Sequence, residues 1–117
     1  MNTSDSVEPE AFEFWLLGLP GFHETSLNWQ DGVLVVYQDG AQRVVPVPSE
    51  SWAGLWALLD RLHAWNWQRH YGNPDVVDGE EWTLIIRRDG KELYCDGVNA
   101  SPRGFASVKD WIKTTIG

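Results

Sequence analysis

The stretch that decides the fold is Trp82–Gly97, W-T-L-I-I-R-R-D-G-K-E-L-Y-C-D-G. Its centre, Asp89-Gly90, favours a two-residue type I′ turn because both central residues of such a turn need positive φ. Counting outward from this turn pairs Leu84 with Cys95 and predicts an antiparallel hairpin. One face of that hairpin is apolar (Trp82, Leu84, Ile86, Leu93 and Cys95), and the other is mixed (Thr83, Ile85, Arg87, Glu92, Tyr94 and Asp96).

Upstream, Asp-Gly pairs at residues 31–32 and 39–40 separate three runs rich in β-branched and aromatic residues. Two-residue turns at both places predict a three-stranded antiparallel meander, in which Trp29 lies opposite Leu34. The middle run, Val33–Tyr37, is apolar on both faces, which is typical of an internal strand.

The segment Ala11–Leu17 is expected to be a strand because it is rich in aromatic residues. A short helix is the alternative, since Pro9 and Gly18 stand where proline and glycine often mark the two ends of a helix. Residues 1–9 are polar and acidic and are predicted to be a flexible tail. The remaining residues, 10–117, are predicted to form a single domain.

Two segments show helical periodicity. Ser49 is the expected N-cap of the first helix, and Ser101 and Pro102 are the expected N-cap and first residue of the second. The predicted buried stripes are Trp52, Leu55, Trp56, Leu59, Leu62 and His63 in the first helix, and Phe105, Val108, Trp111, Ile112 and Ile116 in the second. The predicted class is therefore α+β: an antiparallel sheet (β, three-stranded meander, α, β-hairpin, α) with two helices packed on one face.

The charge of the chain is negative and unevenly distributed. The net charge is −8, and residues 1–50 contribute eight acids against one base. This balance opposes binding to the phosphate backbone of nucleic acids, and it suits electrostatic steering toward a basic protein. We therefore expect no nucleic-acid partner and propose a basic protein partner, while plain solubility remains the simpler interpretation of the charge.

The sequence offers no recognisable catalytic, cofactor or metal motif. Its single cysteine, Cys95, is predicted to face the core and to be unreactive, and it excludes an internal disulfide. No two of the three histidines have metal-ligand spacing, so no metal or cofactor is expected.

The N-terminus lacks the basic region of a signal peptide, and no apolar run is long enough to span a bilayer, so a cytoplasmic protein without a membrane partner is expected. The oligomeric state stays open.

The connection between the first helix and the hairpin is the most unusual part of the sequence. Three aromatic side chains, Trp65, Trp67 and Tyr71, lie outside any predicted element, and a long loop of this kind is often either functional or packed on itself. They are expected to fold back as a lid on the core, followed by an acidic rim. The candidate binding residues are Trp65, Trp67, His70, Tyr71, Asp75, Asp78, Glu80 and Glu81.

Four short patterns in the second half of the chain resemble a group of small bacterial proteins with no established activity. They are W-x-x-L-W-x-x-L-D (Trp52–Asp60), W-N-W-x-x-x-Y (Trp65–Tyr71), D-G-x-x-W-x-L-x-I (Asp78–Ile86) and G-x-N-x-x-P-x-x-F (Gly97–Phe105). The resemblance implies a small stand-alone α+β protein and brings no chemistry with it.

These observations lead to two hypotheses about function. The first is a non-enzymatic acidic binding protein, such as an immunity protein or an inhibitor, that presents exposed aromatics and the acids Glu24, Asp31, Asp39 and Glu50 to a basic partner. The second is a small-molecule or carbohydrate-binding module that uses the Trp65, Trp67 and Tyr71 loop.

Overall fold

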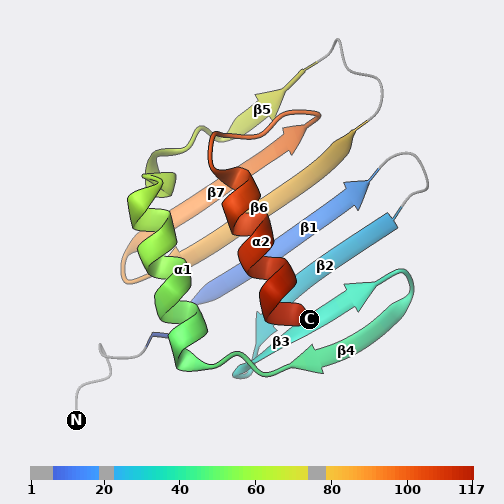
Figure 1. Ribbon diagram of the computed structural model, residues 1–117, viewed down its shortest axis with the longest axis vertical. Helices are drawn as coiled ribbons and strands as arrows, with labels where there is room; N and C mark the ends of the chain where they lie inside the picture. Colours follow the sequence, from blue (N-terminus) through green and yellow to red (C-terminus); the bar gives the residue numbers. More distant parts are fainter. Residues whose placement is uncertain (1–6, 19–22, 74–78) are drawn as a thin grey trace.

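The computed structural model describes residues 7–18, 23–73 and 79–117, which form one sheet of seven strands with two α-helices on one of its faces (Figure 1). The strands are β1 (Ala11–Gly18), β2 (His23–Gln30), β3 (Val33–Gln38), β4 (Ala41–Val45), β5 (His70–Gly72), β6 (Glu80–Arg88) and β7 (Lys91–Val98). The helices are α1 (Ser49–Arg61), the 3₁₀ turn η2 (Ala64–Asn66) and α2 (Phe105–Ile116). The α+β class and the placement of both helices on one face agree with the sequence analysis.

The predicted hairpin is present as β6 and β7. Leu84 lies opposite Cys95, and Asp89 and Gly90 have φ values of 54° and 80°, as a type I′ turn requires. The predicted pairing of Trp29 with Leu34 is also present, between β2 and β3. Register was predictable here because a two-residue turn leaves only one way to align the strands that it joins.

The sheet order is β4-β3-β2-β1-β6-β7-β5, and this order corrects the predicted arrangement in two respects. First, the segment Ala11–Gly18 is a strand, as expected, but it does not stand apart from the other strands: it pairs with both β2 and β6. The expected three-stranded meander is thus part of a four-stranded one, which β1 joins to the hairpin. Second, β5 was not predicted; it pairs in parallel with β7 at the edge of the sheet.

The core lies between the sheet and the two helices, and Trp52 is at its centre. Its ring contacts Phe12, Trp29, Trp56 and Trp111 at centroid distances between 5.1 and 5.8 Å, and its side chain is fully buried. Such edge-to-face and offset aromatic contacts stabilise a core beyond the area they bury. The side chains that the hairpin pattern and the helical stripes predicted to face inward are buried, except that Leu62 and Trp111 are half-buried and His63 is exposed.

Two predictions about the ends of α1 are wrong. His63, predicted to be a core residue, is exposed and has a left-handed backbone (φ 54°), because α1 ends at Arg61 and the chain turns away there. Ser49 does not cap α1; it is the first helical residue, and Pro48 holds the cap position without a side-chain hydrogen bond.

The second helix starts later than predicted. It begins at Phe105 rather than Pro102, and its N-cap is Gly104 with φ 90°. A Cβ on Gly104 would lie 2.7 Å from Leu62 Cδ2, so this position requires glycine both for its backbone and for its contact with the end of α1.

The expected acidic tail includes residues that pack against the domain. Val7 rests on the core, its carbonyl oxygen accepts a 2.6 Å hydrogen bond from Trp56 Nε1, and Pro9 is buried. Residues 1–6 lie outside the described residues. Among the described helices, none has the length and apolar character needed to cross a bilayer.

Candidate functional site on the open face of the sheet

The three aromatic residues of the predicted loop lie at the margin of the core. Trp67 makes an edge contact with Phe105, and Tyr71 stacks on Trp82 at a centroid distance of 6.3 Å. Trp65 instead donates a 3.0 Å hydrogen bond from Nε1 to Asp60 Oδ1. All three side chains are half-buried and packed against the core cluster, as expected for a lid.

This segment has more regular structure than its sequence indicates. Ala64–Asn66 forms a 3₁₀ turn, and His70–Gly72 forms strand β5. The prediction of an irregular loop from Trp65 to Tyr71 is therefore wrong. A three-residue edge strand has too few residues to show an alternating pattern, so no signal in the sequence announced it.

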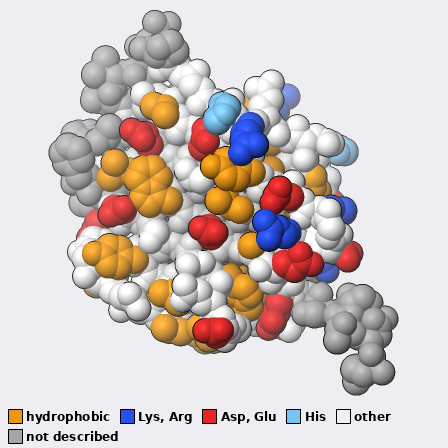
Figure 2. Space-filling view, turned by 180° about the vertical axis from the view of Figure 1, so that it is seen from behind, with side chains coloured by type: hydrophobic (Ala, Val, Ile, Leu, Met, Phe, Trp, Pro, Cys, Tyr) orange, Lys and Arg blue, Asp and Glu red, His pale blue; other side chains and the backbone are white. Residues whose placement is uncertain are grey.

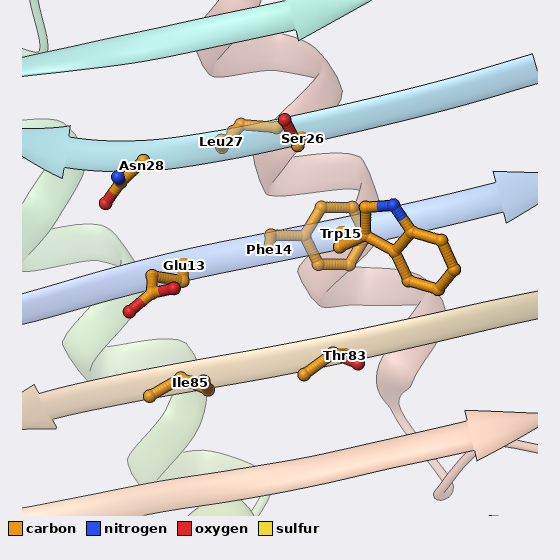
Figure 3. Close-up of a pocket in the computed structure, with 8 residues that line it drawn as sticks. All are labelled: Glu13, Phe14, Trp15, Ser26, Leu27, Asn28, Thr83 and Ile85. Carbon is orange, nitrogen blue, oxygen red and sulfur yellow. The ribbon is translucent and has the colours of Figure 1, made fainter.

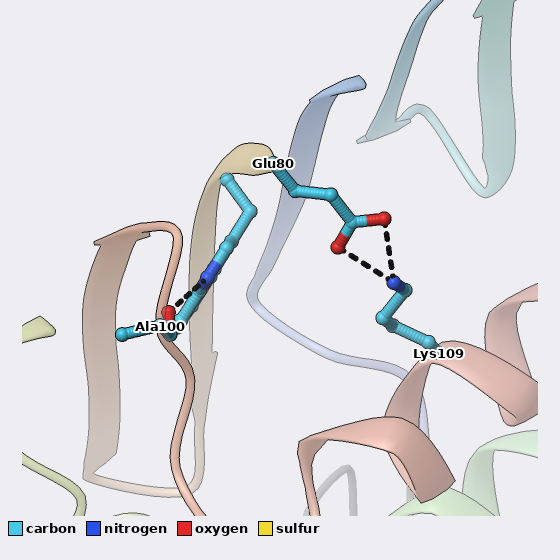
Figure 4. A network of polar contacts seen from close by, with 4 residues as sticks. Glu80, Ala100 and Lys109 are labelled. Atoms are coloured by element: carbon cyan, nitrogen blue, oxygen red, sulfur yellow. Dashed lines mark hydrogen bonds and ion pairs between the residues drawn. The ribbon is translucent and has the colours of Figure 1, made fainter. Parts of the chain in front are cut away.

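The acids and the histidine of the predicted site are not gathered in one place. His70 Nδ1 lies 2.8 Å from Asp96 Oδ1, next to β7. Glu80 pairs with Lys109 of α2, whose Nζ is 2.8 and 3.0 Å from the two carboxylate oxygens (Figure 4). Glu81 points away from the helices, since it is opposite Val98 on the uncovered side. Asp75 and Asp78 lie outside the described residues.

The helices leave the other face of the sheet uncovered, and this face carries apolar side chains that are accessible to solvent. Figure 2 shows it from behind, with hydrophobic side chains interspersed among acidic ones. By strand register, all the large apolar side chains identified as exposed among the described residues lie on this side. They are Tyr37 (39% exposed), Val44 (56%), Tyr94 (38%) and Val98 (48%). We call this surface the open face.

A shallow hollow of about 210 Å³ lies near the middle of the open face, over β1 (Figure 3). Two rows of cross-strand neighbours surround it: Glu13 is flanked by Asn28 and Ile85, and Trp15 is flanked by Ser26 and Thr83. The hollow thus combines an indole, a carboxylate and several small polar groups.

The open face is acidic. Arg87 pairs with Glu92 at 3.0 Å, and His70 lies beside Asp96, so these acids already have partners. Glu24 accepts a 2.7 Å hydrogen bond from Trp15 Nε1. The Glu13 side chain is exposed and has no hydrogen-bond or ion-pair partner among the described residues. The acids of this face are Glu13, Glu24, Glu81, Glu92 and Asp96.

The described residues hold no group of three or more His, Cys, Asp or Glu side chains that is arranged to bind a metal. The thiol of Cys95 is fully buried, as predicted, and burial together with the nearby charge of Asp96 raises its pKa from 9.0 to about 12. The thiol is therefore protonated at neutral pH, and it is a poor nucleophile there.

Sequence reasoning did not single out the open face. The alternation along β1 held the signal, because Glu13 and Trp15 alternate with the buried Phe12 and Phe14. Of the acids proposed to meet a partner, only Glu24 lies on this face. Asp31 and Asp39 occupy turns, and Glu50 lies in the first turn of α1.

No protein-family model matches the sequence, and comparisons with curated proteins and with solved structures found no significant match. The resemblance to small bacterial proteins is untested by these comparisons and stays a prediction.

Proposed function

We propose that this chain is a non-enzymatic binding protein that holds a basic protein partner on the open face of its sheet. The observation that carries the proposal is that four exposed apolar side chains lie on the same acidic face of the sheet, two near one edge (Tyr37 and Val44) and two on β7 (Tyr94 and Val98). Aromatic residues are enriched in protein interfaces, and exposed apolar surface next to polar residues is typical of interaction sites.

The chemistry of the hollow favours a basic side chain as its occupant. A lysine or arginine placed there would pair with the Glu13 carboxylate and lie near the Trp15 ring, to which a cation is attracted electrostatically. The charge of −8 would speed the encounter with such a partner. An immunity protein or an inhibitor that blocks a basic cleft is the form of this function that we favour.

The test compares two charge reversals on opposite sides of the molecule. Glu13→Lys changes the open face, and Asp110→Lys changes an exposed position of α2. Wild type and both variants are used as bait for proteins of the native host, and each captured protein is purified and titrated against all three. We expect a basic partner whose Kd rises at least about tenfold with Glu13→Lys, which corresponds to about 1.4 kcal/mol, and changes little with Asp110→Lys. Equal effects of both reversals on every captured protein would contradict the proposal.

The alternative is a small-molecule or carbohydrate-binding module, and one observation favours it. Trp67 and Tyr71 both line an open pocket of about 460 Å³ on the helix side of the sheet. Trp65 is not part of this pocket, since its indole is directed to Asp60 and the ring lies 5.6 Å from Lys91 Nζ. If the alternative is correct, titration with a ligand should perturb Trp67 and leave Trp65 unchanged.

A further inference from the structure

The pocket beside Trp67 and Tyr71 has a chemical character that the alternative function leaves unspecified. It lies where α1 ends, next to η2 and β5 and against the segment that leads into α2 (Figure 1). Its lining residues are Arg61, Leu62, Asn66, Trp67, Gln68, Tyr71, Pro102 and Arg103. Four separate parts of the fold therefore contribute to one pocket.

Two guanidinium groups line this pocket in a chain whose net charge is −8. Arg61 comes from the last turn of α1, and Arg103 comes from the segment before α2. Neither makes an ion pair with a described residue, although Lys109 and Arg87 elsewhere are both paired with glutamates. Arginine presents several N–H donors in a planar arrangement that matches carboxylate and phosphate oxygens.

The other polar groups of the pocket include further donors. The indole N–H of Trp67 has no hydrogen-bond partner among the described residues. The Tyr71 hydroxyl oxygen accepts a 2.9 Å hydrogen bond from the Gln68 backbone N–H, so the hydroxyl proton is free to donate. Among the residues that the structure describes, no acidic side chain lines the pocket. A pocket whose described lining offers many donors and no carboxylate is suited to an anion.

The apolar wall of the pocket is held in place by the core. Trp67 packs against Phe105, and Tyr71 stacks on Trp82, which is itself buried. Leu62 and Pro102 complete this wall. Rings that are fixed before binding lose little conformational entropy when a ligand arrives, so they offer a ready surface for a flat apolar group.

We propose that this pocket binds a small organic anion with a planar ring, its carboxylate or phosphate on Arg61 and Arg103 and its ring against Trp67 and Tyr71. This inference deepens the alternative function by naming the ligand class. It is independent of the basic-partner proposal, because the pocket lies on the helix side of the sheet and the open face on the other.

The first experiment uses simple probes on the full chain. Benzoate, phenyl phosphate, benzyl alcohol and inorganic phosphate are titrated while the indole N–H signals are followed by NMR. We expect the two aryl anions to shift the Trp67 signal. Benzyl alcohol and inorganic phosphate should each bind at least about tenfold more weakly, because benzyl alcohol lacks the anionic group and inorganic phosphate lacks the ring. The two anions compared with each other tell a carboxylate site from a phosphate site.

The second experiment removes one charge at a time. Of benzoate and phenyl phosphate, the anion that binds more tightly is used here. Arg61→Gln and Arg103→Gln are each expected to raise its Kd by at least about tenfold and to leave the weak binding of benzyl alcohol unchanged. The matched control is Arg43→Gln on the edge strand β4, which should change neither Kd. Thermal unfolding of each variant identifies any loss of fold.

Three outcomes would overturn the inference: no shift of Trp67 with any probe, equal affinity for benzoate and benzyl alcohol, or equal weakening by all three arginine variants. Binding of a neutral methyl glycoside but not of the aryl anions would also overturn it. In that last case the carbohydrate-binding alternative would stand, so the two ideas fail separately.

Discussion

The two faces of the sheet are built from alternate residues of the same strands, and they differ in almost every property. In β1, Phe14 is buried under the helices while its neighbour Glu13 is exposed on the other side. In β6, Leu84 is fully buried while Ile85 borders the shallow hollow. The centre of the covered face is apolar, and charged groups such as the Glu80–Lys109 pair lie at its margin, whereas the open face mixes aromatic, aliphatic and acidic side chains.

This difference separates stability from recognition. Apolar burial against the helices stabilises the fold, and its contribution scales with the area removed from water. The open face contributes less to stability, because its side chains keep contact with water in the folded state. Apolar residues there therefore point to a second surface that binds them, which is the reason for placing the candidate site on this side.

Substitutions on the two faces test this difference, and the largest loss of stability is expected from Trp52→Ala on the covered face. The substitution empties the centre of the aromatic cluster and is expected to cost about 3–5 kcal/mol, as large core truncations do. Urea unfolding measures the loss. A cost below that of an ordinary surface substitution would mean that Trp52 is not central to the core. Trp52→Phe should cost less, because it also removes a buried Nε1 that has no hydrogen-bond partner.

The next largest effect is expected from Gly97→Ala. A Cβ at this position would collide with the Ala100 carbonyl oxygen and the Trp82 indole, and Trp82 Nε1 donates a 2.9 Å hydrogen bond to that same oxygen (Figure 4). We expect a loss of about 1–3 kcal/mol, as overpacking of a core produces. Gly72→Ala is the matched control, since a Cβ there meets nothing within 4 Å. Equal unfolding free energies for the two variants would refute the close packing at Gly97.

A smaller effect, visible only at high pH, is expected from Cys95. Its pKa is raised to about 12 in the folded chain, above the ordinary value of 9.0. Below pH 9 the thiol is neutral in both states, and above it the unfolded chain ionises first, so stability falls as pH rises. The free energy of unfolding should fall more steeply in wild type than in Cys95→Ala, by at most about 1.4 kcal/mol per pH unit. If the free energies of unfolding of wild type and Cys95→Ala change in parallel between pH 8 and 10.5, the pKa of this thiol is not raised by folding.

The smallest effect on stability is expected from Glu13→Lys on the open face. Because Glu13 is exposed and its side chain has no partner among the described residues, the change should stay within about 0.5 kcal/mol. Phe14→Lys, one residue further and on the covered face, should unfold the protein instead, because it buries an unpaired charge. If chemical denaturation finds a similar cost for both, the contrast between the faces does not hold.

The hairpins were predictable because their signals are local. Asp31, Asp39 and Asp89 all adopt positive φ in two-residue turns, and these turns set the register of five of the seven strands with respect to a neighbour. The cores of both helices were predictable from their periodicity for the same reason. The helix ends were not, because the contact between Gly104 and Leu62 that helps to set the start of α2 joins residues far apart in the sequence.

The candidate site was predictable only in fragments. Among the predicted residues, Trp67 and Tyr71 line the pocket on the helix side, and Glu81 and His70 lie on the open face. Glu80 instead forms an ion pair with Lys109 that ties the sheet to α2. Residues that look like one cluster along the chain were divided between two sides of the sheet, since neighbours in a strand point in opposite directions.

The sequence by itself determined the α+β class, the hairpin registers and the apolar residues of the core, because turn chemistry and periodicity act over a few residues. Only the tertiary structure decided that β1 would lie between the meander and the hairpin, and that β5 would extend the edge of the sheet. Both features depend on pairing between strands that are far apart in the sequence. The same is true of the pocket between Arg61 and Arg103, whose residues are 42 positions apart in the sequence.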